Sequence, residues 1–307
     1  MRLANEAIAA EVLPERGMTI AALHTLAGPN VLWERPGHVA PPCSRELGPA
    51  GSPSIDTLHD LLVGGWFEMS PHAGLPGTLD GRPTRLHGEA MRLPWELVDA
   101  GETWVEAEVA TVDGALELTR RVELDGARLT VVSAIRNAGA EPASITHGEH
   151  PCFRRMLFGG GTLTLAARSA AVLPLLDPAN ATLAAGQFAW PHAPTRDGGT
   201  ADLSSIPEHA DGTHDHVAIE LAEPRVELVA PGGPRVTIEV DLDRHPHLLL
   251  WRNHRAPGEP GRGAWDVLAL EPMSAPGMAV DDAVRAGAVQ RLAPGERAVR
   301  TVAVSLA

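Results

Sequence analysis

Residues 103–137 read TWVEAEVATVDGALELTRRVELDGARLTVVSAIRN and contain three segments in which apolar and polar side chains alternate. The segments cover 103–112, 115–124 and 128–137, and Asp-Gly pairs at 113–114 and 125–126 separate them. Alternation with a period of two is typical of a β-strand with one buried face, and Asp-Gly favours a tight hairpin turn. The stretch therefore predicts three consecutive antiparallel strands.

The same pattern continues towards the C-terminus. Segments 216–222, 225–231 and 235–242 alternate in the same way with EP and PGG turns between them, and 291–307 reads as a turn and a final strand. Helical signals are confined to one turn near 56–62 and another within 280–287. Frequent turns with few helices predict an all-β sandwich of antiparallel sheets and argue against a Rossmann fold or a TIM barrel.

Two stretches rich in proline, glycine and serine interrupt the alternation, at 34–60 and 177–213. Strand-like segments flank both stretches without a change of composition. We therefore expect a single domain over 1–307. In such a domain the two stretches would be long loops across one end of the sandwich, where binding groups often lie.

The composition excludes several classes of function. The 307 residues carry 25 cationic and 39 acidic side chains, a net charge of −14 with histidine neutral, which does not suit binding to nucleic acid or an anionic membrane. Every cation is an arginine, which excludes Schiff-base and P-loop lysine chemistry, and tyrosine is absent. No segment has the length and composition of a membrane-spanning helix or a signal peptide. We therefore expect a cytoplasmic protein.

The cysteines and histidines do not form a recognisable metal-binding pattern. Cys43 and Cys152 allow at most one disulfide and no four-thiolate zinc site. Two pairs of histidines share strand faces, but no further ligands accompany them at a recognised spacing. We therefore expect no metal ion. The histidine pairs are 214 with 216 and 245 with 247.

Short motifs hold the polar groups that chemistry would use. They are GGWFEMSPHAG (64–74), LHGEAMRLPWEL (86–97), ITHGEHPCF (145–153), THDHVAIEL (213–221), HPHLLLWRNH (245–254) and LALEPMSAPG (268–277). The motifs place aromatic rings beside carboxylates, arginine and histidine. A neutral polyol needs this combination, because apolar sugar faces stack on tryptophan and hydroxyl groups need donors and acceptors. Our candidate sugar contacts from these motifs are Trp66, Glu68, Glu89 and Arg252.

Four motifs resemble, in the same order, those of the aldose 1-epimerase or galactose mutarotase-like superfamily: LHG (86–88), HPCF (150–153), DH (215–216) and LEP (270–272). The longer forms GGWFEMSPHAG and HGEAMRLPWEL are similar to a divergent branch of aldose-epimerase-like proteins. The resemblance runs from about residue 15 to the C-terminus. It implies a β-supersandwich fold, a small-molecule sugar substrate and no cofactor.

The resemblance also implies roles for four residues. The histidine of H-P-x-F is the family's general acid and the glutamate of ALEP is its general base, which correspond to His150 and Glu271. The LHG histidine and the DH aspartate contact sugar hydroxyls and correspond to His87 and Asp215. Such a protein would interconvert the α and β anomers of a hexose or related aldose by acid–base ring opening.

This chain departs from the family pattern at four positions. Cys152 replaces a tyrosine, Phe67 a glutamine, His72 an asparagine and Met91 an arginine. These changes leave the acid–base pair in place and bear on sugar specificity and on activity itself.

The proposed acid requires a particular protonation state. An imidazolium at neutral pH needs a pKa above the usual value of about 6.5. We therefore expect Glu149 or Glu89 to raise the pKa of His150. His147 is the alternative acid, although the proline of the motif follows His150 directly.

Two other functions fit the sequence. A non-catalytic carbohydrate-binding or sugar-sensing protein would keep the contacts of Trp66, His87 and Asp215 without needing both His150 and Glu271. A hexose-6-phosphate epimerase would need arginines that converge on a phosphate group. The available arginines are Arg82, Arg85, Arg92, Arg154, Arg155 and Arg252. In each case we expect a monomer or a homodimer.

Overall fold

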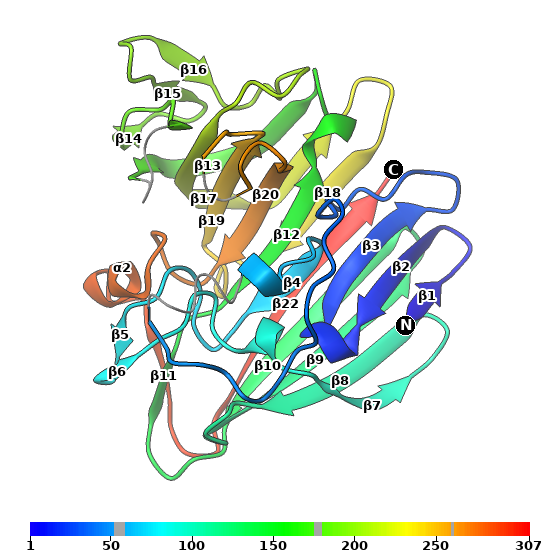
Figure 1. Ribbon diagram of the computed structural model, residues 1–307, viewed down its shortest axis with the longest axis vertical. Coiled ribbons are helices and arrows are strands. Elements are labelled where there is room, and N and C mark those ends of the chain that lie inside the picture. The colour runs from blue at the N-terminus through cyan, green and yellow to red at the C-terminus, as the bar shows by residue number, and fades with distance from the viewer. Residues whose placement is uncertain (52–58, 175–179, 259–260) are drawn as a thin grey trace.

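The computed structural model describes residues 1–51, 59–174, 180–258 and 261–307, and most of its regular structure is β-strand (Figure 1). The strands are β1 (Arg2–Ala4), β2 (Ile8–Leu13), β3 (Thr19–Thr25), β4 (Trp66–Met69), β5 (Thr78–Leu79), β6 (Arg82–Pro83), β7 (Glu96–Ala100), β8 (Trp104–Ala110), β9 (Leu116–Asp125), β10 (Arg128–Asn137), β11 (Ala143–Ile145), β12 (Gly148–Arg154), β13 (Thr162–Leu173), β14 (Gly186–Phe188), β15 (His192–Pro194), β16 (Thr200–Asp202), β17 (His214–Val229), β18 (Arg235–Val240), β19 (His247–His254), β20 (Asp266–Met273), β21 (Gln290–Leu292) and β22 (Arg297–Leu306).

The described helices are short. They are α2 (Val280–Arg285) and the 3₁₀ turns η1 (Pro14–Arg16), η2 (Ala90–Arg92) and η3 (Arg155–Leu157). Helix α2 confirms the helical turn predicted within 280–287. The other predicted turn, near 56–62, begins outside the described residues, and 59–61 are helical. No described helix is long and apolar enough to cross a membrane.

Sixteen strands form one sheet, whose main path runs β1-β2-β3-β4-β12-β20-β19-β17-β18-β22-β10-β9-β8-β7. Strand β13 joins this sheet by pairing with β17 and β14. Neighbours along the path are antiparallel, including the predicted β8-β9-β10 meander over 103–137. The all-β, antiparallel class expected from the alternation is confirmed.

One predicted turn is absent. The EP pair at 223–224 was expected to separate two strands, but β17 continues from His214 to Val229. Strand β17 pairs with β19 through residue 220 and with β18 from residue 225. Pro224, which has no amide hydrogen, lies at this change of partner, where no bond to either strand is needed. Pro224 therefore marks the position at which β17 changes its pairing partner from β19 to β18.

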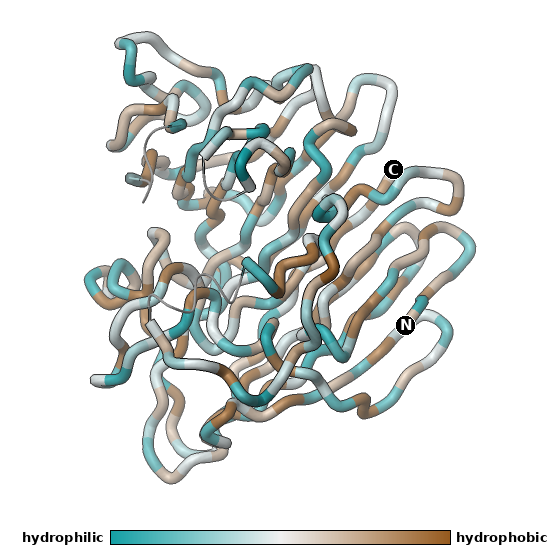
Figure 2. Tube along the Cα trace, in the orientation of Figure 1, coloured by the Kyte–Doolittle hydropathy of each residue, from teal (hydrophilic) through white to brown (hydrophobic). Residues whose placement is uncertain are grey.

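The sheet folds over so that β9 and β10 face β4 and β12. Contacts across the interior show this arrangement, because Arg120 on β9 reaches both Glu68 on β4 and Glu149 on β12. Along β9 the buried positions alternate with exposed ones, as expected for a strand with one inner face. Figure 2 shows the same alternation of apolar and polar residues along neighbouring strands. The main core fills the space between the two layers.

A second apolar cluster lies on the outer side of the β4-β12-β20-β19 segment. Trp33, Leu61 and Leu62, which flank the first long stretch, pack there with Phe67 and Trp251 from the sheet. The described part of the second long stretch contains the short strands β14, β15 and β16, which lie at the upper left of Figure 1. The residues that flank the first stretch thus cover a face of the sheet that carries polar motif residues.

Candidate active site

Five neighbouring strands, in the order β4-β12-β20-β19-β17, carry the candidate site. The register of β4 with β12 sets Phe67 opposite His150, and the register of β12 with β20 brings His150 level with Glu271. On the next two strands Trp251 lies opposite His216. Since side chains alternate between faces along a strand, these five side chains share one face, which we call the site face.

His150 and Glu271 are in direct polar contact on the site face. The Nε2 atom of His150 lies 3.3 Å from Oε1 of Glu271. The two residues are only 4% and 1% exposed. An imidazole and a carboxyl group at this distance can pass a proton between them, so the structure brings together the two residues predicted as acid and base.

Aromatic rings fix the position of the His150 imidazole. Phe67 stacks on it at 4.5 Å between ring centroids with an angle of 19° between the planes. His87 and Trp251 approach it edge-on at 5.2 and 5.8 Å. Next to this group His216 stacks on Trp251 at 6.1 Å. The rings leave the His150 imidazole little freedom to rotate.

His87 reaches the site through a strained turn. Its φ is 57°, a left-handed conformation that is uncommon outside glycine. The amide of His87 donates to the carbonyl of Gly74 at 2.8 Å, which ties the turn to the segment after β4. At Gly88 a Cβ atom would lie 2.3 Å from the carbonyl oxygen of Ser70, so the glycine of the LHG motif permits this close approach.

Burial controls the protonation of the pair. Burial lowers the pKa of His150 to about 3 and raises the pKa of Glu271 well above its usual value. The expectation that a carboxylate raises the pKa of His150 is therefore wrong, and Glu149 lies on the opposite face of β12. Both shifts favour the uncharged forms, a neutral imidazole beside a protonated carboxyl group.

Several polar atoms on the site face have no hydrogen-bond partner among the described residues. They are Glu271 Oε2, Trp251 Nε1, His216 Nδ1 and His87 Nδ1. Unpaired buried polar groups are costly and therefore few in folded proteins. Here donors and acceptors gather beside an acid–base pair, which is the arrangement that a hydroxylated ligand would satisfy.

Trp66 and Glu68 lie on the other face of β4, inside the sandwich. The indole Nε1 of Trp66 donates to Glu149 at 2.7 Å, and Glu68 accepts from Arg120 at 3.1 Å. Both residues are fully buried. The expectation that they contact sugar does not fit this position, because β4 turns positions 66 and 68 inward and Phe67 towards the site face.

These inward residues belong to an interior cluster of Glu68, Arg120, Ser133, His147 and Glu149. Arg120 bonds to Glu149 through both terminal nitrogens, at 2.6 and 2.9 Å, and Ser133 donates to Glu68 at 3.0 Å. The two carboxylates raise the pKa of Arg120 against the opposing effect of burial. The guanidinium is therefore the cation that compensates both acids.

His147 belongs to the interior cluster and not to the site face. Its Nε2 lies 3.3 Å from Glu68 Oε1, and its Nδ1 lies 3.0 Å from Nε2 of His245. Among the described residues, Glu68, His147 and Glu149 are the group whose donor atoms could converge on a metal ion. Because Arg120 already contacts both carboxylates, this arrangement fits an internal salt bridge better than a metal site.

Asp215 and Arg252 form an ion pair on the face of β17 and β19 opposite to His216 and Trp251. Arg252 Nη2 lies 2.6 Å from Asp215 Oδ2. Asp215 also accepts from the amide groups of Thr182 and Leu183 at 3.1 and 3.0 Å. Their predicted role as sugar contacts therefore does not fit, since the carboxylate anchors the 182–183 backbone.

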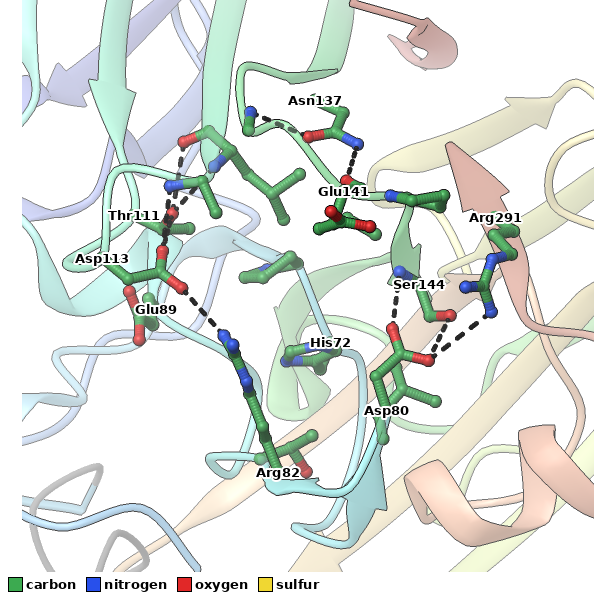
Figure 3. A pocket seen from close by; sticks show the side chains of 18 of the residues that line it. His72, Asp80, Arg82, Glu89, Thr111, Asp113, Asn137, Glu141, Ser144 and Arg291 are labelled. Atoms are coloured by element: carbon green, nitrogen blue, oxygen red, sulfur yellow. Dashed lines mark hydrogen bonds and ion pairs between the residues drawn. The ribbon is translucent and has the colours of Figure 1, made fainter. Parts of the chain in front are cut away.

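Glu89 faces a separate cavity of about 630 Å³, shown in Figure 3. Its Oε2 accepts from the amide of Val112 at 2.9 Å. His72 lies in the middle of the view, and burial lowers its pKa to about 4. The charged side chains around the cavity pair with one another as Arg82–Asp113 and Arg291–Asp80. Glu89 thus lies away from the site face, contrary to its predicted role.

Several solved structures resemble this chain in fold and are distant from it in sequence. Two are described as a "putative aldose 1-epimerase". The one from Escherichia coli K12 has a TM-score of 0.70 at 17% identity, with 100% of this chain and 98% of the other covered. The one from Klebsiella pneumoniae has a TM-score of 0.73 at 16% identity, with 98% and 77% covered. A galactose mutarotase related enzyme from Lactobacillus acidophilus has a TM-score of 0.65 at 14% identity, with 100% and 97% covered.

These likenesses establish the class of fold. The protein has the galactose mutarotase-like fold, as the order of its motifs predicted. By sequence, the chain belongs to the family described as "Domain of unknown function (DUF4432)", whose pattern matches residues 1–306. A comparison with curated protein sequences finds no match.

Sequence reasoning missed the positions of several site-face residues. Phe67, His216 and Trp251 each lie one position along a strand from a residue chosen in their place, namely Glu68, Asp215 and Arg252. The signal that could have separated them is the period of two along each strand. Once His150 is placed on one face, its strand partners on that face follow from the register.

Proposed function

We propose that the protein is an aldose 1-epimerase that interconverts the α and β anomers of a free hexose or related aldose. The observation that carries the proposal is the 3.3 Å contact between His150 and Glu271 on a face with unpaired donors and acceptors. This pair supplies one acid and one base at the same place, which anomer interconversion requires. The likeness of the fold to proteins described as mutarotases supports the same reaction class.

The chemistry needs a single proton on the pair. In the ion-pair form, Glu271 takes the proton of the C1 hydroxyl while Nε2 of His150 gives its proton to the ring oxygen. The C1–O5 bond breaks, the aldehyde rotates about C1–C2, and closure on the other face returns each proton. The pair therefore begins and ends the cycle with the same number of protons, and no redox partner is involved.

The shifted pKa values suit this exchange. A low pKa makes protonated His150 a stronger acid towards the ring oxygen, and a high pKa makes ionised Glu271 a stronger base. The neutral form and the ion pair differ only in the position of one proton across the 3.3 Å contact. The reactive form is therefore one proton transfer away from the neutral one.

The arginines favour a free sugar over a phosphorylated one. Arg155 bonds to Asp266, Arg252 to Asp215, and Arg92 to the carbonyl of Gly88. Arg82 and Arg85 pair with acids around the Figure 3 cavity, Asp113 and Glu89. A phosphate group would need several of these side chains together beside His150, and their partners hold them elsewhere.

The test is an assay of anomer exchange. Saturation-transfer NMR or polarimetry would follow α/β interconversion of glucose, galactose and other aldoses with wild type, His150→Gln and Glu271→Gln. His192→Gln and Glu96→Gln are matched controls, because both residues are exposed. We expect acceleration by wild type and both controls and its loss in both site variants. Saturable sugar binding without acceleration would instead indicate a carbohydrate-binding protein and overturn the proposal.

A further inference from the structure

The second ring nitrogen of His150 also has a partner. Cys152 follows two positions later on β12, so its side chain lies on the same face. Its Sγ lies 3.2 Å from Nδ1 of His150. The residue is fully buried and forms no disulfide, and burial raises the pKa of its thiol well above the usual value. The partner of Nδ1 is therefore a neutral thiol.

The direction of this hydrogen bond follows from the other contacts. The backbone carbonyl of His150, at 3.8 Å, is an acceptor for the thiol hydrogen, and with that hydrogen on the carbonyl the sulfur can accept from Nδ1 at 3.2 Å. On the other side of the ring, Glu271 Oε1 lies 3.3 Å from Nε2, and the raised pKa of Glu271 favours a protonated carboxyl group that donates to this nitrogen. A neutral imidazole carries one N–H, and with Nε2 accepting, that hydrogen belongs on Nδ1.

We propose that Cys152 is a positioning residue for His150, with its sulfur accepting the Nδ1–H so that Nε2 is the nitrogen that exchanges protons. Phe67 fixes the plane of the ring, and the sulfur fixes which edge faces Glu271. Because the Nδ1–H bond is kept whether or not Nε2 is protonated, the ring need not turn over during a cycle. Only the kinetic consequence of this contact rests on the proposed function, and the assignment of the hydrogen bond does not.

A neutral acceptor has a distinct effect on acidity. A carboxylate bonded to Nδ1 would stabilise the imidazolium and raise the pKa of His150. A thiol orients the ring without adding a charge, so His150 keeps the lowered pKa that burial gives it. Cys152 thus combines orientation with a strong acid at Nε2.

The first test needs no turnover. Nitrogen-15 NMR of histidine-labelled protein reports which ring nitrogen is protonated, and the signals of His150 are those lost in His150→Gln. We expect wild type and Cys152→Ser to carry the hydrogen on Nδ1, because a hydroxyl oxygen also accepts it. In Cys152→Ala the Nδ1 signal should move, since its acceptor is removed. A hydrogen on Nε2 with a bare Nδ1 in wild type, or unchanged signals in Cys152→Ala, would overturn the proposal.

The second test uses anomer exchange. We expect Cys152→Ala to lower kcat by about 10-fold with KM within about twofold, and Cys152→Ser to recover most of the rate. Cys43→Ala is the matched control, because that thiol faces the carbonyl of Met91, and its kcat should not change. A serine variant as slow as the alanine variant would contradict the positioning role. A wild type that shows the expected Nδ1–H but no exchange would refute the proposed function and leave the hydrogen-bond assignment standing.

Discussion

Strand β12 contributes to a histidine–glutamate group on each of its faces, with Glu149 on the inner face and His150 on the site face, and the two groups differ in how their polar atoms are paired. On the inner face, Glu149 accepts two bonds from Arg120 and one from Trp66. On the site face, His150 and Glu271 contact each other without a cation, and Glu271 Oε2 has no partner among the described residues. Both groups are buried to a similar degree.

The difference separates a structural role from a chemical one. A buried carboxylate that bonds to a guanidinium stays ionised and holds two layers of the sandwich together. A buried carboxylate beside a neutral imidazole has a raised pKa and can gain or lose a proton. Residue type alone does not distinguish the two groups, because both contain histidine and glutamate.

Acid pH should affect both groups, and it gives the largest expected effect. Six buried histidines have lowered pKa values: His72, His87, His147, His150, His216 and His245. Below pH 6.5 the unfolded chain binds protons that the folded chain does not, so stability present above pH 6.5 is lost as the pH falls towards the lowered values. The raised pKa of Glu271 opposes this loss. We expect the free energy of unfolding to fall by about 5 kcal/mol between pH 6.5 and 5.5.

Urea titrations at several pH values would measure this loss. His147→Gln and His150→Gln should each reduce the pH dependence by about one proton, although they lie on opposite faces. A denaturation midpoint independent of pH between 7.5 and 5.5 would show that these histidines titrate in the folded protein as they do in the unfolded chain.

Removal of the interior cation should destabilise the fold. Arg120→Leu leaves two buried carboxylates uncompensated, and we expect a loss of about 3–5 kcal/mol in urea denaturation. Arg121→Leu is the matched control, because this neighbour points outward and pairs with half-exposed Glu106. The control should change stability by less than about 1 kcal/mol. Equal losses of stability in the two variants would show that the buried arginine contributes no more to folding than its outward-facing neighbour.

The two glutamates should respond in opposite ways to the same substitution. We expect Glu149→Gln to cost about 3 kcal/mol, since it breaks a buried ion pair. Glu271→Gln should leave stability within about 1 kcal/mol, because the folded state already favours the uncharged carboxyl group, while exchange falls by about 10²–10⁴-fold. Thermal unfolding and the exchange assay measure the two quantities. A Glu271→Gln protein as unstable as Glu149→Gln would make Glu271 structural.

Substitution of Asp215 tests which face of β17 contacts the sugar, and its expected effect on stability is smaller. Asp215→Asn removes the charge that pairs with Arg252 and should cost about 2 kcal/mol in urea denaturation. We expect KM for the sugar to stay within about threefold, while His87→Ala raises it more. A KM as high as that of His87→Ala would place Asp215 against the substrate.

The smallest expected effect concerns the pH dependence of kcat/KM, where we expect no change near neutral pH. Because burial lowers the pKa of His150 to about 3, the pair takes up no second proton between pH 7.5 and 6.0. We expect kcat/KM to be flat over this range, which stopped-flow polarimetry in a series of buffers would check. A transition centred near pH 6.5 would mean that His150 titrates like an exposed histidine.

The sequence predicted the fold, and it named two residues, His150 and Glu271, that the structure places in contact, but it predicted the surrounding contacts less well. Alternation over 103–137 was sufficient for the meander, and the order of the motifs located His150 and Glu271. Trp66, Glu68, Asp215 and Arg252 were assigned from motif membership, although neighbours in a strand point to opposite faces. The lowered pKa of His150 was also out of reach, because burial depends on the whole sandwich.

The alternation along β12 also bears on how such a protein could be redesigned. Positions 149 and 153 face the interior, while 150 and 152 face the site. Substitutions at 152, or at positions 67 and 251 on the neighbouring strands, would therefore alter the surroundings of His150 without touching the internal salt bridge. The two faces of one strand thus separate the surroundings of His150 from the salt bridge that joins the two layers of the sandwich.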